Sequence, residues 1–138
     1  MLVPMTSSGD GSAGVTDRDH VAGERLPVIT DDSLRERIGR AQPYTAVLIR
    51  KTAKYQRPQA DATVWEHGRR NVALAEHGVL AIVMPVSNDP TDWAGLAVFT
   101  APPDEVAKIM DHDPGVQAGI FSYEIHPLRG FPGAALPA

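Results

Sequence analysis

Residues 65–84, WEHGRRNVALAEHGVLAIVM, predict a helix that passes directly into a strand. The helix begins among ionisable side chains, and His67 is one of them. Gly78 should end it, because glycine readily adopts the left-handed conformation found at helix C-termini. The apolar run Val79–Met84 that follows has the composition of a buried strand. This stretch therefore places one helix beside one strand of a sheet, with His67 in the first part of the helix.

The helix carries apolar residues on two sides. At about 100° per residue, Trp65 and Val72 share one side, while His67, Asn71 and Leu74 share nearly the opposite side. A helix patterned in this way should be covered on both sides, once by the sheet and once by a further element or subunit. The pattern leaves open which side meets the sheet.

The segments around this stretch divide the chain into four parts. Residues 1–29 are rich in Gly, Ser, Thr and Asp without apolar periodicity, so we expect a flexible tail. Residues 30–43 predict an accessory helix over 32–41, since Thr30 and the carboxylates after it suit a helix start. The main domain should cover 44–127 and an irregular tail 128–138, with irregular backbone already from Pro127 onward.

Within the main domain the patterns predict strand, helix, strand, strand, helix, strand. Apolar and β-branched runs mark the strands at 44–51, 79–86, 93–100 and 119–126. The second helix should begin at Pro102 and Pro103 and end near Asp111, before Pro114. A polar loop, 52–63, precedes the first helix, and a turn over 87–92 joins the middle strands.

This order predicts an α+β domain of the ferredoxin-like type, βαββαβ, with an antiparallel sheet and both helices on one face. The other face of such a small sheet also needs cover. We therefore predict a homodimer in which two sheets pack face to face.

Composition excludes several classes of function. The 138 residues suit one domain, and the net charge of −4 argues against nucleic-acid binding. Without cysteine there is no thiolate nucleophile and no disulfide framework. The longest apolar run, 79–86, is too short for a membrane span, and the first residues lack the pattern of a secretory signal. A cytoplasmic protein without membrane association is expected.

One short motif resembles a cofactor site. Gly9–Gly14 matches GxGxxG, but the dinucleotide fingerprint needs a strand before it and a helix after it. Neither pattern is present, so the match is better explained by a linker, and no cofactor is predicted.

Three motifs together resemble the YCII-related family of dimeric α/β barrels, over roughly residues 44–127. They are Glu66–Gly68, Glu76–Leu80 and Asp113–Gly119. The resemblance implies that His67 and Asp113 form a polar pair in a pocket. It also implies acid/base chemistry on small organic molecules, including dehydrochlorination of a hydroxylated aromatic ring in one branch. The tail, the accessory helix and the long 52–64 loop depart from the short family form.

The residues themselves support the same pair. An unperturbed imidazole has a pKa of about 6.5, so His67 can exchange protons at neutral pH while Asp113 fixes its tautomer. In the alternative, His67 caps a polar helix end and Asp113 only binds amides in its turn. Candidate ligand-binding residues are guanidinium groups suited to planar anions and tyrosines able to stack; they are Arg50, Arg70, Tyr55 and Tyr123.

Two other chemistries receive little support. A metal site from His67, His112 and Asp113 lacks any recognised ligand spacing, and no GxSxG nucleophile motif occurs. The leading hypothesis is acid/base catalysis without a cofactor, of the lyase, isomerase or dehydrochlorinase type, on a small organic anion. The alternative is a ligand-binding or assembly module with the same fold and no turnover.

Overall fold

The computed structural model describes residues 17–138. The described residues divide into two compact units, 17–36 and 37–138. The first unit contains a short 3-10 helix, Asp17–Asp19, and a hairpin of β1, His20–Val21, and β2, Glu24–Arg25. These elements lie within the segment 1–29, for which a flexible tail is predicted. The turn explains the hairpin, because Ala22 and Gly23 both have positive φ, as a tight two-residue turn requires. The Gly9–Gly14 motif lies outside the described residues.

Helix α1, Asp31–Gly39, occupies the position predicted for the accessory helix. The hydroxyl of Thr30 accepts a hydrogen bond from the Ser33 amide at 3.2 Å, which caps the helix start. The helix ends two residues before the expected Ala41, and Pro43 lies in the following strand.

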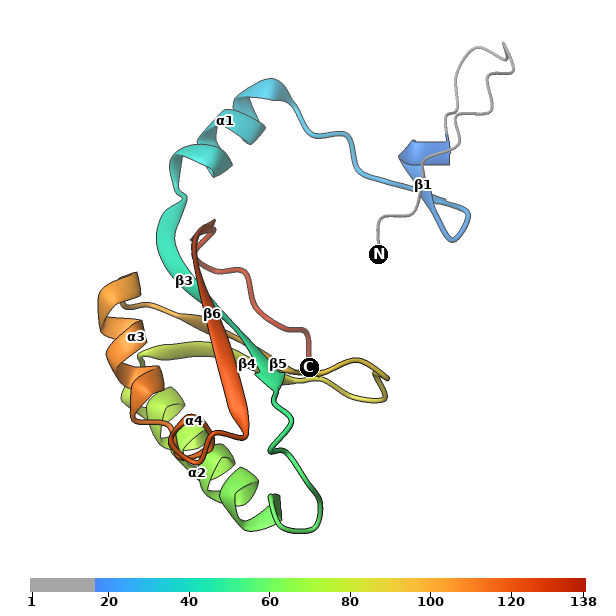
Figure 1. Cartoon of the computed structure of the whole chain (residues 1–138). Coiled ribbons are helices and arrows are strands. Elements are labelled where there is room, and N and C mark those ends of the chain that lie inside the picture. The colour runs from blue at the N-terminus through green and yellow to red at the C-terminus, as the bar shows by residue number, and fades with distance from the viewer. Residues whose placement is uncertain (1–16) are drawn as a thin grey trace. The chain divides into compact units, whose positions relative to one another are not determined.

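The second unit contains a four-stranded antiparallel sheet in the order β4-β5-β3-β6 (Figure 1). This strand order and the sequence βαββαβ define a ferredoxin-like α+β fold, as predicted. Its elements in chain order are β3 (Gln42–Lys51), α2 (Asp61–His77), β4 (Leu80–Pro85), β5 (Trp93–Phe99), α3 (Pro103–Asp111), α4 (Pro114–Gln117) and β6 (Phe121–Gly130).

Helices α2 and α3 cover the same face of this sheet. The buried core joins Val47 and Ile49 of β3 to Val106 and Met110 of α3, and Leu74 of α2 packs against it. Successive strand residues point to opposite faces. The face away from the helices therefore carries the alternate, largely apolar residues of the strands, among them Leu48, Ile82, Met84, Leu96 and Val98.

Two boundaries differ from the sequence prediction. Helix α2 begins at Asp61, one turn before Trp65, although Ala60 at its N-cap makes no side-chain cap. Strand β6 continues through Pro127 to Gly130, where an irregular tail was expected. Proline is tolerated there because β6 is an edge strand, so half of its backbone amides face away from the ladder.

The C-terminal end of α2 agrees with the prediction. Gly78 has φ 96° and its amide binds the Ala75 carbonyl, so the helix stops at the expected glycine. Across residues 17–138, none of the helices is both long enough and apolar enough to span a membrane.

Candidate active site

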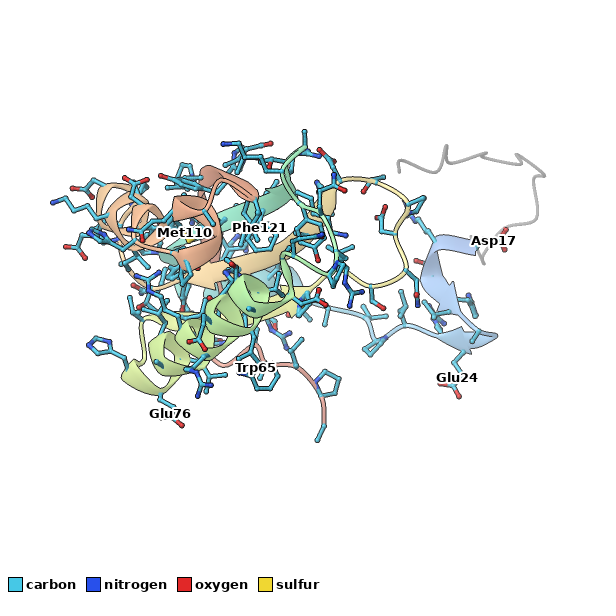
Figure 2. The ribbon with its side chains drawn as sticks, turned by 60° about the horizontal axis from the view of Figure 1, so that its bottom comes forward. Asp17, Glu24, Trp65, Glu76, Met110 and Phe121 are labelled. Carbon is cyan, nitrogen blue, oxygen red and sulfur yellow. The ribbon has the colours of Figure 1, made fainter. Side chains whose placement is uncertain are left out.

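Helix α2 turns its two apolar sides to different environments. The side with His67 and Leu74 faces the sheet, and the His67 side chain is only 14% exposed. The opposite side is open to solvent, and Trp65 on that side is 70% exposed. Its side chain stands out from the helix in Figure 2. The structure thus decides what the helical periodicity left open: the histidine side meets the sheet.

Asp113 is held at the start of the short helix α4. It has an extended backbone conformation at the N-cap, with Pro114 at the first helical position. Its Oδ2 accepts hydrogen bonds from the amides of Gly115 at 2.9 Å and Val116 at 3.2 Å. The residue is 1% exposed. Gly115 is required here, because an added Cβ would lie 2.3 Å from the Phe121 ring.

The structure brings His67 and Asp113 into direct contact. Nδ1 of His67 lies 2.7 Å from Oδ1 of Asp113, although the residues are 46 positions apart. The side-chain amide nitrogen of Asn71, one turn later on α2, lies 3.2 Å from Nε2 of the imidazole. The Phe121 ring packs against the imidazole edge-on at 5.0 Å. With Nδ1–H donating to Asp113 and Asn71 donating to Nε2, the neutral imidazole keeps a lone pair on Nε2.

The carboxyl group of Asp113 is ionised in this setting. Burial by itself raises its pKa, but the hydrogen bond from His67, the positive charge that His67 carries when it is protonated, and the amides of Val116 and Gly115 outweigh burial. The pKa of Asp113 is therefore lowered below its ordinary value. Arg70 adds a further positive charge 4.0 Å from Oδ1, while donating a hydrogen bond to the Ile109 carbonyl at 2.8 Å. A buried anion held by several donors is a firm anchor for the imidazole.

A cavity of about 310 Å³ opens beside the imidazole, between α2 and the ends of β4 and β5. Its walls are mostly apolar, with His67 and Asn71 on one side and Lys51 supplying a cation. The ammonium group of Lys51 lies 5.0 Å from the centre of the Tyr55 ring, which in turn stacks on Phe121. We call this space the His67 cavity; it is lined by Ile49, Lys51, Tyr55, Val64, His67, Gly68, Asn71, Val83, Met84, Pro85, Val86, Ala94, Gly95, Leu96 and Phe121.

The four candidate ligand-binding residues lie in different places. Tyr55 lines the His67 cavity. Arg50 follows Ile49 on β3 and so points to the other face of the sheet, where it pairs with Asp92 and Glu124. Arg70 lies behind Asp113, outside the cavity lining.

Tyr123, the fourth, also lies outside the cavity lining. Its hydroxyl donates to Asp111 at 2.5 Å, and this bond is the main reason why the pKa of Tyr123 is raised. Of the four candidates, Tyr55 is therefore the one that lines the His67 cavity.

His112 does not join His67 and Asp113 in a cluster. Its Nδ1 lies 2.7 Å from the Lys108 carbonyl, one turn back on α3. Within residues 17–138, no group of three His, Asp or Glu side chains is arranged to hold a metal ion.

Three residues at the site were not selected from the sequence. Asn71 is four positions after His67, a spacing that places two residues on the same helix face and could have indicated its role. Lys51 and Phe121 are brought in by the pairing of β3 with β6, where they are directly opposite each other. No local pattern indicates that pairing.

Comparison with known proteins finds similarity in structure only. No family model matches the sequence, and no curated protein matches it. One similar structure is the 5-chloro-2-hydroxyhydroquinone dehydrochlorinase of Burkholderia phenoliruptrix in complex with 2,5-dihydroxybenzoquinone, at 13% identity and TM-score 0.44, covering 60% of this chain and 90% of that chain.

Two further structures are similar at a comparable level. One is a dimeric protein of unknown function with a ferredoxin-like fold from Bacteroides fragilis, at 17% identity and TM-score 0.43, covering 64% of this chain and 95% of that one. The other is a hypothetical protein of Arabidopsis thaliana, at 12% identity and TM-score 0.36, with 69% and 91% covered. None of these similarities assigns a ligand to this chain.

Proposed function

We propose that the His67 cavity binds a small organic anion and that His67 acts there as a general acid/base, oriented by Asp113. The observation that carries this proposal is the 2.7 Å contact between Nδ1 and the buried carboxylate, beside a cavity that the imidazole lines. An imidazole fixed in this way can take a proton at Nε2, and the neighbouring carboxylate stabilises the cation that results.

The chemistry follows from the position of Nε2. A ligand with an acidic C–H or O–H bond transfers its proton to Nε2, and the electron pair of that bond moves into the ligand. Return of the proton at another atom gives an isomerisation, and loss of a leaving group gives an elimination. For this step a ligand takes the place of the Asn71 side chain, which lies 3.2 Å from Nε2. The proposed steps use only side chains of the protein.

An anionic ligand is favoured by the charges at the cavity. Lys51 is the cation among the lining residues, and it lies against the aromatic ring of Tyr55. A carboxylate or phenolate placed near Lys51 would gain an ion pair, and its apolar body would contact Phe121 and Tyr55. This arrangement supports a small acid, enol or phenol as ligand.

A binding module without turnover is the second candidate. Its support is that Nε2 already has a partner in Asn71, and that Asp113 also binds two amides of α4. A pair of this kind can serve only to hold α2 against α4. The module then uses the same cavity for a ligand that it does not convert.

The remaining parts of the proposal concern the protein as a whole. We propose a cytoplasmic homodimer of the YCII-related type, built by packing the apolar outer faces of two sheets. Support comes from the half-buried Leu48, Leu96 and Val98 and the exposed Met84 on that face. Multi-angle light scattering should give twice the mass of the chain; a monomer at all concentrations would contradict the dimer.

Proton transfer can be tested without knowing the natural substrate. Small acids, ketones and phenols are first screened for binding by thermal shift. Bound ligands are then incubated with the protein in D₂O, and exchange of their acidic C–H protons is followed by NMR. We expect the wild type to accelerate exchange and His67→Gln to lower the rate by at least about 100-fold.

The matched control is His77→Gln, because His77 is an exposed histidine in the last turn of the same helix. It should exchange at the wild-type rate. Ligands that bind and never exchange, with the same thermal shift in His67→Gln, would overturn catalysis in favour of the binding module.

A further inference from the structure

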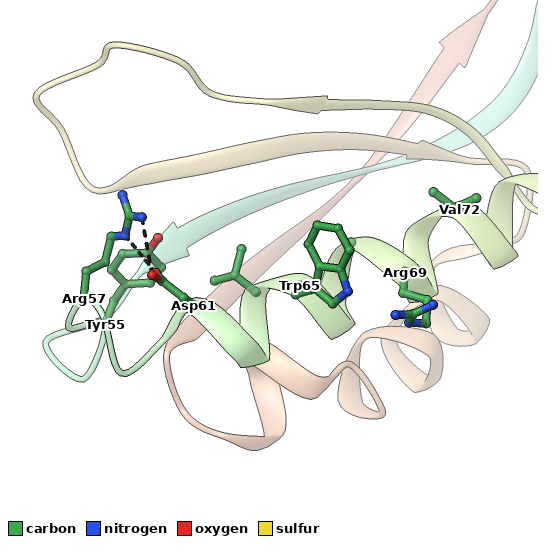
Figure 3. Close-up of a pocket in the computed structure, with 8 residues that line it drawn as sticks. Tyr55, Arg57, Asp61, Trp65, Arg69 and Val72 are labelled. Carbon is green, nitrogen blue, oxygen red and sulfur yellow. Dashed lines mark hydrogen bonds and ion pairs between the residues drawn. The ribbon is translucent and has the colours of Figure 1, made fainter.

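A second hollow lies on the outer side of α2. This outer groove has a volume of about 910 Å³ and extends along the helix from Asp61 to Val72 (Figure 3). At a rise of about 1.5 Å per residue, that stretch of helix is roughly 16 Å long. The groove is lined by Tyr55, Arg57, Asp61, Val64, Trp65, Gly68, Arg69 and Val72.

The outer groove and the His67 cavity share part of their walls. Tyr55, Val64 and Gly68 line both spaces, so the two are neighbours across a single turn of α2. These three residues therefore form the boundary between the inner and the outer space. Of the three, Gly68 is the one without a side chain.

Gly68 lowers the stability of helix α2. Glycine inside a helix is less favourable than alanine by about 0.5 to 1 kcal/mol. A close packing contact often explains such a glycine, but here an added Cβ would meet nothing within 4 Å. Gly68 is exposed and lines both hollows, so a larger side chain at this position would project into the space where they meet.

We propose that the ligand of this protein is elongated, with its ionisable head at His67 and an apolar tail that passes over Gly68 into the outer groove. This inference rests on the proposed function and extends it from a small anion to an acid with a hydrocarbon or aryl tail. Gly68 is a specificity-determining residue in this arrangement, because it keeps the passage open.

The groove walls define the chemistry of the tail. Trp65 and Val72 present exposed apolar surface, at 70% and 61% exposure. The two cations at the groove are already engaged by carboxylates: Arg57 binds Asp61 at 2.8 Å and Arg69 binds Glu66 at 3.2 Å. The groove therefore offers contact to an uncharged tail, and the charge of the ligand belongs at the head.

The test uses straight-chain carboxylates from butanoate to dodecanoate, below the concentrations at which they form micelles. Binding is measured by calorimetry and by tryptophan fluorescence, in which Trp65 reports on the groove. The wild type should bind each longer acid more tightly, by up to several-fold per methylene group until the groove is filled.

Variants at Gly68 separate the passage from the cavity. Gly68→Leu should lose the gain in affinity with tail length, so that butanoate and dodecanoate bind with similar affinity. Gly68→Ala should keep much of that gain and melt at a higher temperature than the wild type. Ala73→Leu is the matched control, because Ala73 is an exposed residue of α2 outside both linings, and it should retain the full dependence on length.

Three outcomes would overturn the inference: affinity independent of tail length in the wild type, a length dependence unchanged in Gly68→Leu, or a change of oligomeric mass in that variant with ligand preference intact. The last would make the groove a protein interface. Failure of the proposed function looks different, since carboxylate binding would then rise with tail length while none of the bound ligands with acidic C–H bonds exchanged a proton. Exchange on ligands with acidic C–H bonds, together with carboxylate binding that shows no length preference, would leave the proposed function standing and reject the tail.

Discussion

The two sides of helix α2 are built from similar residues and have opposite surroundings. One side places His67 and Leu74 against the sheet, and the other leaves Trp65 and Val72 in solvent. Hydrophobicity does not explain the difference, because the larger apolar residues are on the open side. The side that meets the sheet is the one whose polar residue finds a buried partner, Asp113. The composition of α2 leaves its packing side undecided. The side that packs on the sheet is the one that makes the buried polar contact.

The largest effect on stability is expected from replacing Asp113, which holds the buried side of α2 in place. Asp113→Ala removes the acceptor of His67 and of two amides. We expect the free energy of unfolding in urea to fall by about 3 to 5 kcal/mol, as when one partner of a buried polar pair is removed. Asp113→Asn keeps an oxygen for the amides and should lose less. Losses below about 1 kcal/mol in both variants would show that the carboxylate has no special role.

The two sides can be compared directly by removing one large apolar residue from each. Leu74→Ala should lower the free energy of unfolding by about 2 kcal/mol or more, because Leu74 packs on the core. Trp65→Ala should change it by less than about 0.5 kcal/mol, since the indole is exposed. Chemical denaturation measures both. A large loss from Trp65→Ala would mean that another surface covers the open side.

The glycine between the two sides gives a smaller effect of opposite sign. Gly68→Ala should raise the free energy of unfolding by about 0.5 to 1 kcal/mol, because alanine is the better helix former and the added methyl group has room. Thermal and urea unfolding check this result. A loss of stability would show that the position is less open than the structure indicates.

The smallest effect is the contribution of one carboxyl group to the pH dependence of stability. The pKa of Asp113 is lower in the folded protein than its ordinary value of about 3.9, so the ionised group stabilises the fold above that pH. As the pH falls below about 3.9, this contribution is lost. The stability difference between wild type and Asp113→Asn should therefore shrink in acid, measured by urea unfolding at several pH values. A difference that grows in acid would contradict the lowered pKa.

Much of the fold could be predicted from local patterns. The strands, the Gly78 stop and the helix beginning at Pro103 each have a signal within a few residues. The start of α2 was missed because Ala60 gives no capping signal. The predicted range of strand β6 ends too early, because Pro127 suggests a break. Proline is acceptable at this position only because β6 is an edge strand.

The site could be predicted in part. His67 and Asp113 were identified, and the structure brings them together, while their catalytic role remains a proposal. Lys51 and Phe121 could not be predicted locally, because strand pairing brings them to the cavity. Arg50 is predicted to bind the ligand, but the alternation of side chains along β3 directs it to the opposite face of the sheet. Whether a side chain reaches a pocket depends on which face of the sheet the helices cover.

The sequence by itself determined the order of elements, the antiparallel βαββαβ fold and the two apolar sides of α2, because periodicity and turn residues act over a few positions. Only the tertiary structure decided which side of α2 meets the sheet. That choice depends on contacts between residues far apart in the chain, such as His67 with Asp113. The tertiary structure also places the His67 cavity and the outer groove next to the same turn of α2, with Gly68 in the lining of both.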